Sequence, residues 1–224
     1  MSRRLLEIVI PALLTAPWLA LAQVPRSNTI PSYKDLKFPP LGKINIPDIA
    51  QVTLPNGMKL YLLENHELPL VSGFALVRTG NLFDPKDKIG LATITGMVMR
   101  TGGTKSETGD QLDEKLENIA ASVESGIGET NGRVSFSALK ENTDEVMSIF
   151  RDLLTIPEFR QEKIDLAKTQ ANTAISRRND EPGGIVGRET TKLAYGVDSP
   201  YARQSEYATI ASITRDDASG LRLM

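Results

Sequence analysis

Cysteine is absent from the 224 residues of this chain, and histidine occurs once, as His66. The first absence excludes disulfide bonds and thiolate metal sites. His66 lies between two predicted strands, beside acidic residues, and we interpret it as an ordinary loop residue. With His66 placed elsewhere, Ser135 and Ser137 on a predicted strand have no imidazole base, which excludes a serine triad.

Aromatic residues make up only 5% of the chain, and no excess of positive charge is present, since the formal net charge is -2. A protein without a basic surface is not expected to bind nucleic acid. The share of hydrophobic residues, 40%, is ordinary for a soluble globular protein. The length is enough for one domain with a sizeable core.

The N-terminus has the three parts of a secretory signal peptide. Arg3 and Arg4 precede a mostly apolar stretch, and small residues lead to a predicted cleavage after Ala22. The apolar stretch is short and broken for a membrane span. The alternatives are a permanent N-terminal anchor and, from "SRRLLE", a twin-arginine export signal. The sequence predicts an exported protein, periplasmic or secreted, that has no membrane segment after cleavage and begins at Gln23.

Three regions follow from this pattern. Residues 1–22 are the predicted signal peptide, and residues 23–48 are a proline-rich arm or linker that does not fit a regular element. Residues 49–224 are the predicted folded domain. Strands and helices alternate in this domain, with antiparallel hairpins, which predicts the α+β class.

The individual elements are predicted from apolar periodicity, turn residues and caps. They are a hairpin over 52–63, a strand at 70–80, helices at 90–100 and 109–122, two strands within 122–142, and helices at 142–159, 160–180, 185–196 and from within 199–217. Asn142 or Thr143 is expected to cap its helix, and Thr108 to cap the helix before it. "GGIVG" at 183–187 lacks the Lys-Ser/Thr of a phosphate loop and is interpreted as the beginning of a helix.

Several sequence segments resemble a known family. They read "TLPNGMKLYLLENHELPLVSGFALVRTGN", "GLA", "TGGT", "NDEPGGIVGRETTKLAYG", "SPYARQ" and "ITRDD". From about Gln51 to about Asp217 the order of elements is similar to the N-terminal domain of the pitrilysin/insulinase/mitochondrial-processing-peptidase family of zinc metallopeptidases. The resemblance implies a mitochondrial-processing-peptidase-like metallohydrolase domain, with a mostly antiparallel sheet and helices packed on one face. It also implies an incomplete C-terminal end, because family members continue with another helix and strand.

The family's zinc motif is replaced at every position. Active members read roughly Gly-Leu-Ala-His-x-x-Glu-His, where two histidines one helical turn apart hold zinc and the glutamate takes a proton from bound water. Here Thr93 and Met97 stand at the histidine positions, and Gly96 stands at the glutamate position. The third family ligand, a glutamate 77 positions beyond the second histidine, corresponds to Ala174. We therefore expect no catalytic residue, no metal site and no cofactor, although zinc is the cofactor of the family.

We expect the helix at 90–100 to pack against the sheet and complete the core, although it lacks the metal-binding and catalytic residues of the family. Gly96 in mid-helix costs about 1 kcal/mol relative to alanine, and the sequence offers no helical reason for it. An alternative is that Met97 and Met99 line a peptide groove, because methionine adapts to varied surfaces.

The resemblance also implies a peptide-binding edge. In the family, an edge strand near "SVESGIG" binds extended substrate by strand addition. The corresponding residues are Ser122, Val123, Glu124, Ser125, Gly126, Ile127 and Gly128. An ordinary edge strand without this capacity is the alternative.

Together, these observations predict a non-catalytic, exported member of the family that forms part of a peptide-binding clamshell. The predicted partner is an active peptidase subunit or a second peptidase-like domain of the same family. A free-standing periplasmic peptide-binding or scaffolding domain is the alternative. A third reading, an active zinc metalloendopeptidase with another ligand set, conflicts with the shortage of donor residues.

Overall fold

The computed structural model describes residues 33–44 and 46–221. The predicted signal peptide and its cleavage position lie outside these residues. The chain divides into two compact units, one that ends at Glu64 and one that begins at Asn65. Within the described residues, no helix combines the length and the apolar character needed to cross a membrane.

The described part of the first unit contains one antiparallel hairpin. Strands β1 (Ala50–Thr53) and β2 (Lys59–Leu62) pair with Val52 opposite Leu60. The turn between them is set by Gly57, whose φ of 85° is accessible to glycine at little cost. The predicted hairpin at 52–63 is therefore confirmed. Ahead of it, only a 3-10 turn, η1 (Tyr33–Asp35), interrupts the irregular course of the described part of the arm.

The second unit is built on a three-stranded antiparallel sheet. The strands are β3 (Leu70–Val77), β4 (Ser122–Ile127) and β5 (Gly132–Leu139), in the order β3-β5-β4. Phe74 of β3 lies opposite Ser135 of β5, and Ser125 of β4 lies opposite Val134. β4 is thus at one edge of the sheet.

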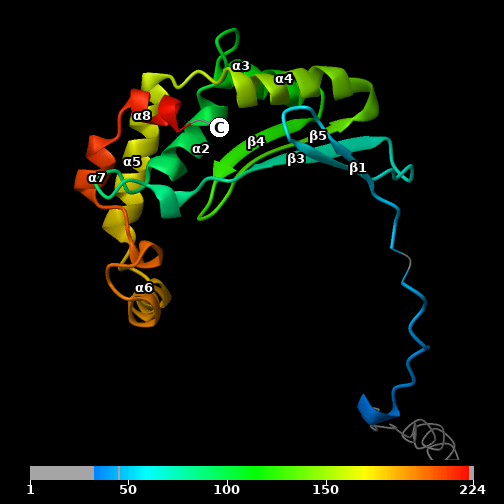
Figure 1. The fold of residues 1–224 in the computed structure, drawn as a ribbon, viewed down its shortest axis with the longest axis horizontal. Helices are drawn as coiled ribbons and strands as arrows, with labels where there is room; N and C mark the ends of the chain where they lie inside the picture. Colours follow the sequence, from blue (N-terminus) through cyan, green and yellow to red (C-terminus); the bar gives the residue numbers. More distant parts are fainter. Residues whose placement is uncertain (1–32, 45, 222–224) are drawn as a thin grey trace, which may run out of the picture. The chain divides into compact units, whose positions relative to one another are not determined.

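The helices of this unit cover one face and one edge of the sheet. They are α2 (Leu91–Thr101), α3 (Gly109–Asn118), α4 (Thr143–Thr155), α5 (Gln161–Arg177), α6 (Pro182–Tyr195), α7 (Tyr207–Ser212) and α8 (Arg215–Gly220), with 3-10 turns η2 (Asn81–Phe83), η3 (Lys140–Asn142) and η4 (Pro200–Ala202). In Figure 1, α3 and α4 lie over the strands, α2 runs beside β4, and α5 lies against α2. This arrangement confirms the predicted α+β fold with helices on one face.

The core lies between the sheet and these helices. Alternation of side chains along β4 and β5 directs Val123, Ile127, Val134 and Ala138 to the buried side. On β3, by contrast, Phe74 and other residues of the same parity are exposed, so the second face of the sheet carries no helix of this unit.

The observed ends of α3 and α4 are explained by local hydrogen bonds and backbone angles, and some of them differ from the predicted ends. Thr108 forms a capping box with Gln111, as its position predicts. α3 ends at Asn118 rather than at 122, because Ala120 has a φ of 49° and begins the turn into β4. Asn142 precedes α4, but its side chain donates to the Ile119 carbonyl instead of capping the helix.

Candidate functional site

Helix α2 carries the positions that the resemblance assigns to the zinc motif, and most of its residues are buried. Eight of its residues are buried: Leu91, Ala92, Ile94, Thr95, Gly96, Val98, Met99 and Arg100. Its N-cap is Gly90, with a φ of 106° that a side chain would rarely adopt. A Cβ at Gly90 would also approach the side chain of Ile210 to 2.7 Å. The helix thus begins where α7 packs against it.

A buried carboxylate satisfies the first turn of α2. Asp84 accepts hydrogen bonds from the backbone N–H groups of Gly90, at 2.8 Å, and Ala92, at 3.0 Å. These donors have no partner within the helix, and a negative charge at the helix N-terminus is favourable. Burial raises the pKa of Asp84 above its usual value, and the backbone hydrogen bonds offset part of that rise. Asp84 therefore stabilises the beginning of α2 at a desolvation cost.

Gly96, at the position of the family's catalytic glutamate, faces β4. A Cβ placed there would lie 2.3 Å from the backbone nitrogen of Ile127 and 2.8 Å from the carbonyl carbon of Gly126. The Gly96 carbonyl also accepts a 2.6 Å hydrogen bond from the Ser125 hydroxyl. The helix alone does not explain why position 96 is glycine, but its packing does. Without a Cβ at this position, α2 can lie directly against β4. A glutamate side chain does not fit in this contact.

Thr93 and Met97, at the two histidine positions, lie on the outward side of α2. Thr93 is exposed, and its hydroxyl donates to the side-chain oxygen of Asn81 at 3.1 Å. Met97 is 38% exposed. The two positions that the resemblance assigns to the histidines thus lie one turn apart on the same side of the helix, where they carry a hydroxyl and a thioether.

Ala174 and Thr93 both line a cavity of about 440 Å³, which we call the α2–α5 pocket. Its lining comes from α2, α5, α6 and the segments around them: Asn81, Leu82, Ile89, Gly90, Thr93, Ile94, Glu129, Ala171, Ala174, Ile175, Arg178, Arg188, Pro200, Tyr201, Arg203, Gln204, Ser205 and Ile210. Gly96 and Met97 are not among these residues. The structure therefore brings together two of the four vacated positions in one pocket and places Gly96 against β4.

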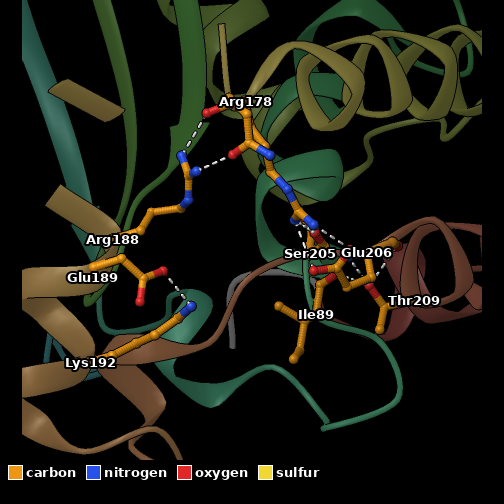
Figure 2. Close-up of polar contacts among 9 residues, drawn as sticks. Ile89, Arg178, Arg188, Glu189, Lys192, Ser205, Glu206 and Thr209 are labelled. Carbon is orange, nitrogen blue, oxygen red and sulfur yellow. Dashed lines mark hydrogen bonds and ion pairs between the residues drawn. The ribbon is translucent and has the colours of Figure 1, made fainter. Parts of the chain in front are cut away.

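Three arginines border the α2–α5 pocket. Arg178, at the end of α5, forms two hydrogen bonds with the Glu206 carboxylate, at 2.8 and 2.9 Å. Arg188 of α6 donates to the Arg178 carbonyl at 2.7 Å and to the side-chain oxygen of Asn179. Figure 2 shows Arg188 reaching the backbone of Arg178 from α6, while the Arg178 guanidinium extends away toward Glu206. Arg203 donates to the Asp84 backbone carbonyl at 3.2 Å.

The predicted peptide-binding strand is β4 with the following Gly128, and part of its edge is occupied. The Val123 carbonyl accepts a hydrogen bond from Arg100 at 2.7 Å, and the Gly128 carbonyl accepts one from the Asn81 N–H at 2.9 Å. Residues 124–128 line a shallow hollow together with Asn131, Arg133 and Ser135. The central residues of β4 are contacted by α2, since Gly96 lies against Gly126 and Ile127 and accepts a hydrogen bond from Ser125. Strand addition at this edge stays a prediction.

The zinc ion implied by the family resemblance does not fit the residues present. A zinc site needs three or four nitrogen, sulfur or oxygen donors in tetrahedral geometry. Thr93, Gly96, Met97 and Ala174 supply no imidazole, thiolate or carboxylate. Among the described residues, no three side chains of histidine, cysteine, aspartate or glutamate come together as a group that could hold a metal ion. His66 is exposed in the loop before β3.

Sequence reasoning did not find Asp84, Arg188 and Arg203. Arg203 stands within the recognised "SPYARQ" segment, and Asp84 stands six residues before the helix-initiating Gly90. A capping carboxylate is normally sought at the N-cap itself, so the spacing of Asp84 concealed its role. The arginines are brought together only by the packing of α5, α6 and the segment after η4.

Comparisons with known proteins give matches in both sequence and structure. A family model described as Insulinase (Peptidase family M16) matches residues 62–199. A curated relative, the Non-peptidase homolog YmxG of Helicobacter pylori, is 28% identical over 118 residues, which are 53% of this chain and 27% of the relative.

Solved structures share the fold at lower identity. The peptidase M16 inactive domain from Pseudomonas fluorescens superposes with a TM-score of 0.71 at 20% identity, over 78% of this chain and 42% of the other. The periplasmic protease PqqL from Escherichia coli gives a TM-score of 0.67 at 16% identity, over 84% of this chain and 21% of the other. The chain thus spans less than half the length of each of these relatives.

Proposed function

The chain belongs to the insulinase family, peptidase family M16, and we propose that it is a non-catalytic member that binds peptides and holds no zinc. The observation that carries this proposal is the state of α2. The helix is packed as a core element, while its motif positions hold Thr93, Gly96 and Met97 and its contact with β4 leaves no room for a glutamate. The names of two relatives, a non-peptidase homolog and an inactive domain, support the same conclusion.

We further propose that the chain forms one wall of a peptide chamber, opposite an active peptidase subunit or a second peptidase-like domain of the same family. Supporting this, the relatives are longer than the region that this chain matches. Several apolar side chains of α6 are also exposed, including Ile185, Val186 and Leu193. A free-standing periplasmic peptide-binding domain is the second candidate, and the α2–α5 pocket is the feature that favours it, since it is formed within a single unit.

Peptide binding and cleavage are tested on the same sample. The full chain is incubated with fluorescein-labelled peptides of varied sequence, binding is followed by anisotropy, and the peptides are then examined by mass spectrometry. The proposal predicts binding with every peptide intact after prolonged incubation. Cleavage that is abolished by a chelator would contradict it.

The partner is tested by sedimentation. The full chain is mixed with a purified family member that carries an intact His-x-x-Glu-His motif from the same organism. A complex is expected if the chain is a chamber wall, whereas two independently sedimenting species would favour the free-standing module. Export is tested by N-terminal sequencing of protein from the periplasmic fraction, which should begin at Gln23 and not at Ser2.

A further inference from the structure

We propose that the α2–α5 pocket recognises the C-terminal carboxylate of a bound peptide, with Arg203 and Arg188 as the recognising groups. This inference rests on the proposed peptide-binding function and specifies which part of the peptide is bound. It is carried by the charges, the hydrogen-bond partners and the lining of the pocket.

Arg203 has the least committed guanidinium of the three arginines. A guanidinium has five N–H donors, and Arg203 uses one of them, on the Asp84 backbone carbonyl at 3.2 Å. Among residues 33–44 and 46–221, it has no ion-pair partner. Its side chain lines the pocket and is only partly exposed. Four of its donors are therefore uncommitted, although its charge also acts on the buried Asp84 carboxylate and opposes the rise in pKa that burial causes there.

Arg188 is held in place without being neutralised. Both of its hydrogen bonds go to neutral oxygens, the Arg178 carbonyl and the Asn179 side chain, so that its charge has no carboxylate partner in the part of the chain that is described. Arg178 is different, because the Glu206 carboxylate compensates it through two hydrogen bonds. The only acidic residue among those lining the pocket is Glu129, which is exposed. Arg188 thus has an uncompensated charge at the pocket, and Arg203 shares its charge with the buried Asp84 carboxylate.

The rest of the lining selects the kind of anion. The lining also includes apolar side chains from three helices: Ile94, Ala171, Ala174, Ile175 and Ile210. A small inorganic anion would leave this apolar surface uncovered. The last residue of a peptide presents a carboxylate next to an aliphatic side chain, and a cavity of about 440 Å³ accommodates such a residue. A planar guanidinium pairs with a carboxylate through two parallel hydrogen bonds.

The alanine at position 174 contributes to this selection. A glutamate there, as in active relatives, would place a negative charge in the same pocket and repel a carboxylate. In this chain the position offers a methyl group. Loss of the family's third metal ligand therefore leaves a pocket that is both apolar and positively charged.

The test compares two peptides that differ at one group. A fluorescein-labelled pentapeptide that ends in leucine is prepared as the free acid and as the C-terminal amide, and each is titrated with the full chain. The free acid is expected to bind at least about tenfold more tightly, as one additional charge-assisted pair implies. Arg203→Gln should abolish this preference, and Arg203→Lys should keep part of it. Arg151→Gln on α4, which removes an exposed arginine far in sequence from the pocket, should leave it unchanged.

Each outcome is decisive. Equal binding of acid and amide by the unsubstituted chain would overturn carboxylate recognition while leaving peptide binding intact, and this comparison does not depend on how well any variant folds. Binding of neither peptide would overturn both this inference and the peptide-binding proposal. A preference for the acid that persists in a folded Arg203→Gln variant would show that another group recognises the carboxylate, and would overturn the assignment to Arg203.

Discussion

Helices α2 and α6 both contribute to the α2–α5 pocket, but they are held in opposite ways. Eight of the eleven residues of α2 are buried, whereas none of the fourteen residues of α6 is. α6 is attached mainly through the hydrogen bonds of Arg188 and the stacking of Tyr195 on Tyr201, whose ring centroids are 5.0 Å apart. Leu193 of α6 is 88% exposed.

This difference in burial indicates that α2 and α6 have different roles in the protein. α2 completes the core, and this packing does not require histidine or glutamate at the positions that hold Thr93, Gly96 and Met97. α6 buries too little to be explained by the core of this unit, and its exposed apolar residues are available to another surface. The two helices thus give the pocket one wall that is fixed by packing and one that depends on a few polar and aromatic contacts.

The largest effect is expected where α2 touches β4. Gly96→Ala should lower the free energy of unfolding by about 2–3 kcal/mol, because the added Cβ meets the backbone of β4 and no rotamer can relieve the contact. The same substitution at Gly187 of α6, where no atom lies within 4 Å of the new Cβ, should raise it by about 0.5–1 kcal/mol through helix propensity. Urea denaturation measures both. Equal effects at the two positions would contradict the described contrast between the helices.

The anchor of the α2 N-terminus comes next. Asp84→Ala leaves the N–H groups of Gly90 and Ala92 buried without an acceptor, and should cost about 2 kcal/mol. Thermal unfolding of the variant should show a lower midpoint with the fold retained. A stability equal to that of the parent would mean that the helix does not depend on this cap.

The pH dependence of Asp84 has a defined sign. Because its pKa is raised on folding, the folded protein holds the proton more firmly than the unfolded chain. The unfolding free energy of the parent, relative to that of Asp84→Asn, should therefore increase as the pH falls through the folded pKa toward 3.8. A difference that decreases over this range would indicate a lowered pKa.

A smaller effect is expected where the loop before α2 is tied to α8. Asp217 pairs with Lys88 and also accepts hydrogen bonds from Thr214, which lowers the pKa of Asp217 to about 2. Its contribution should be present above pH 3.8 and be lost as the pH falls through about 2. Asp217→Asn should cost about 1 kcal/mol at neutral pH, since the pair is partly screened by solvent. Asp216→Asn, on the same turn, is the control and should change stability by less than about 0.5 kcal/mol.

The smallest effect concerns a buried hydroxyl within α2. The side-chain oxygen of Thr95 is buried and has no hydrogen-bond partner in the described structure. Thr95→Val keeps the shape and removes the unpaired polar atom, so it should stabilise the protein by up to about 1 kcal/mol. Thr191→Val on exposed α6 should have little effect. Destabilisation by Thr95→Val would show that this hydroxyl does have a partner.

The sequence was sufficient for elements whose signals are local. Apolar periodicity placed α2 at 90–100, and the observed helix is Leu91–Thr101. Pro-Asn-Gly predicted the β1–β2 turn, and Thr108 the cap of α3. Residues 183–187 were expected to begin a helix that continues to 196, and α6 begins at Pro182, because proline is well suited to the first helical turn.

What the sequence could not supply depends on contacts between distant segments. The purpose of Gly96 is visible only when Ile127 of β4 lies against it. Arg188 and Arg203 acquire a common role only after α5, α6 and the segment around 203 are packed together. The sequence can show that the residues of a motif are absent, but it cannot show which contacts and which pocket are present in that region.

Zinc retention tests the central claim most directly. The full chain is equilibrated with zinc, dialysed exhaustively, and analysed for metal. A triple variant, Thr93→His with Met97→His and Ala174→Glu, serves as the positive control, with Gly96 left unchanged because glutamate does not fit there. The account predicts that the control retains zinc and that the parent does not, because the parent lacks donors and not the helix arrangement. One zinc ion per parent chain would contradict it.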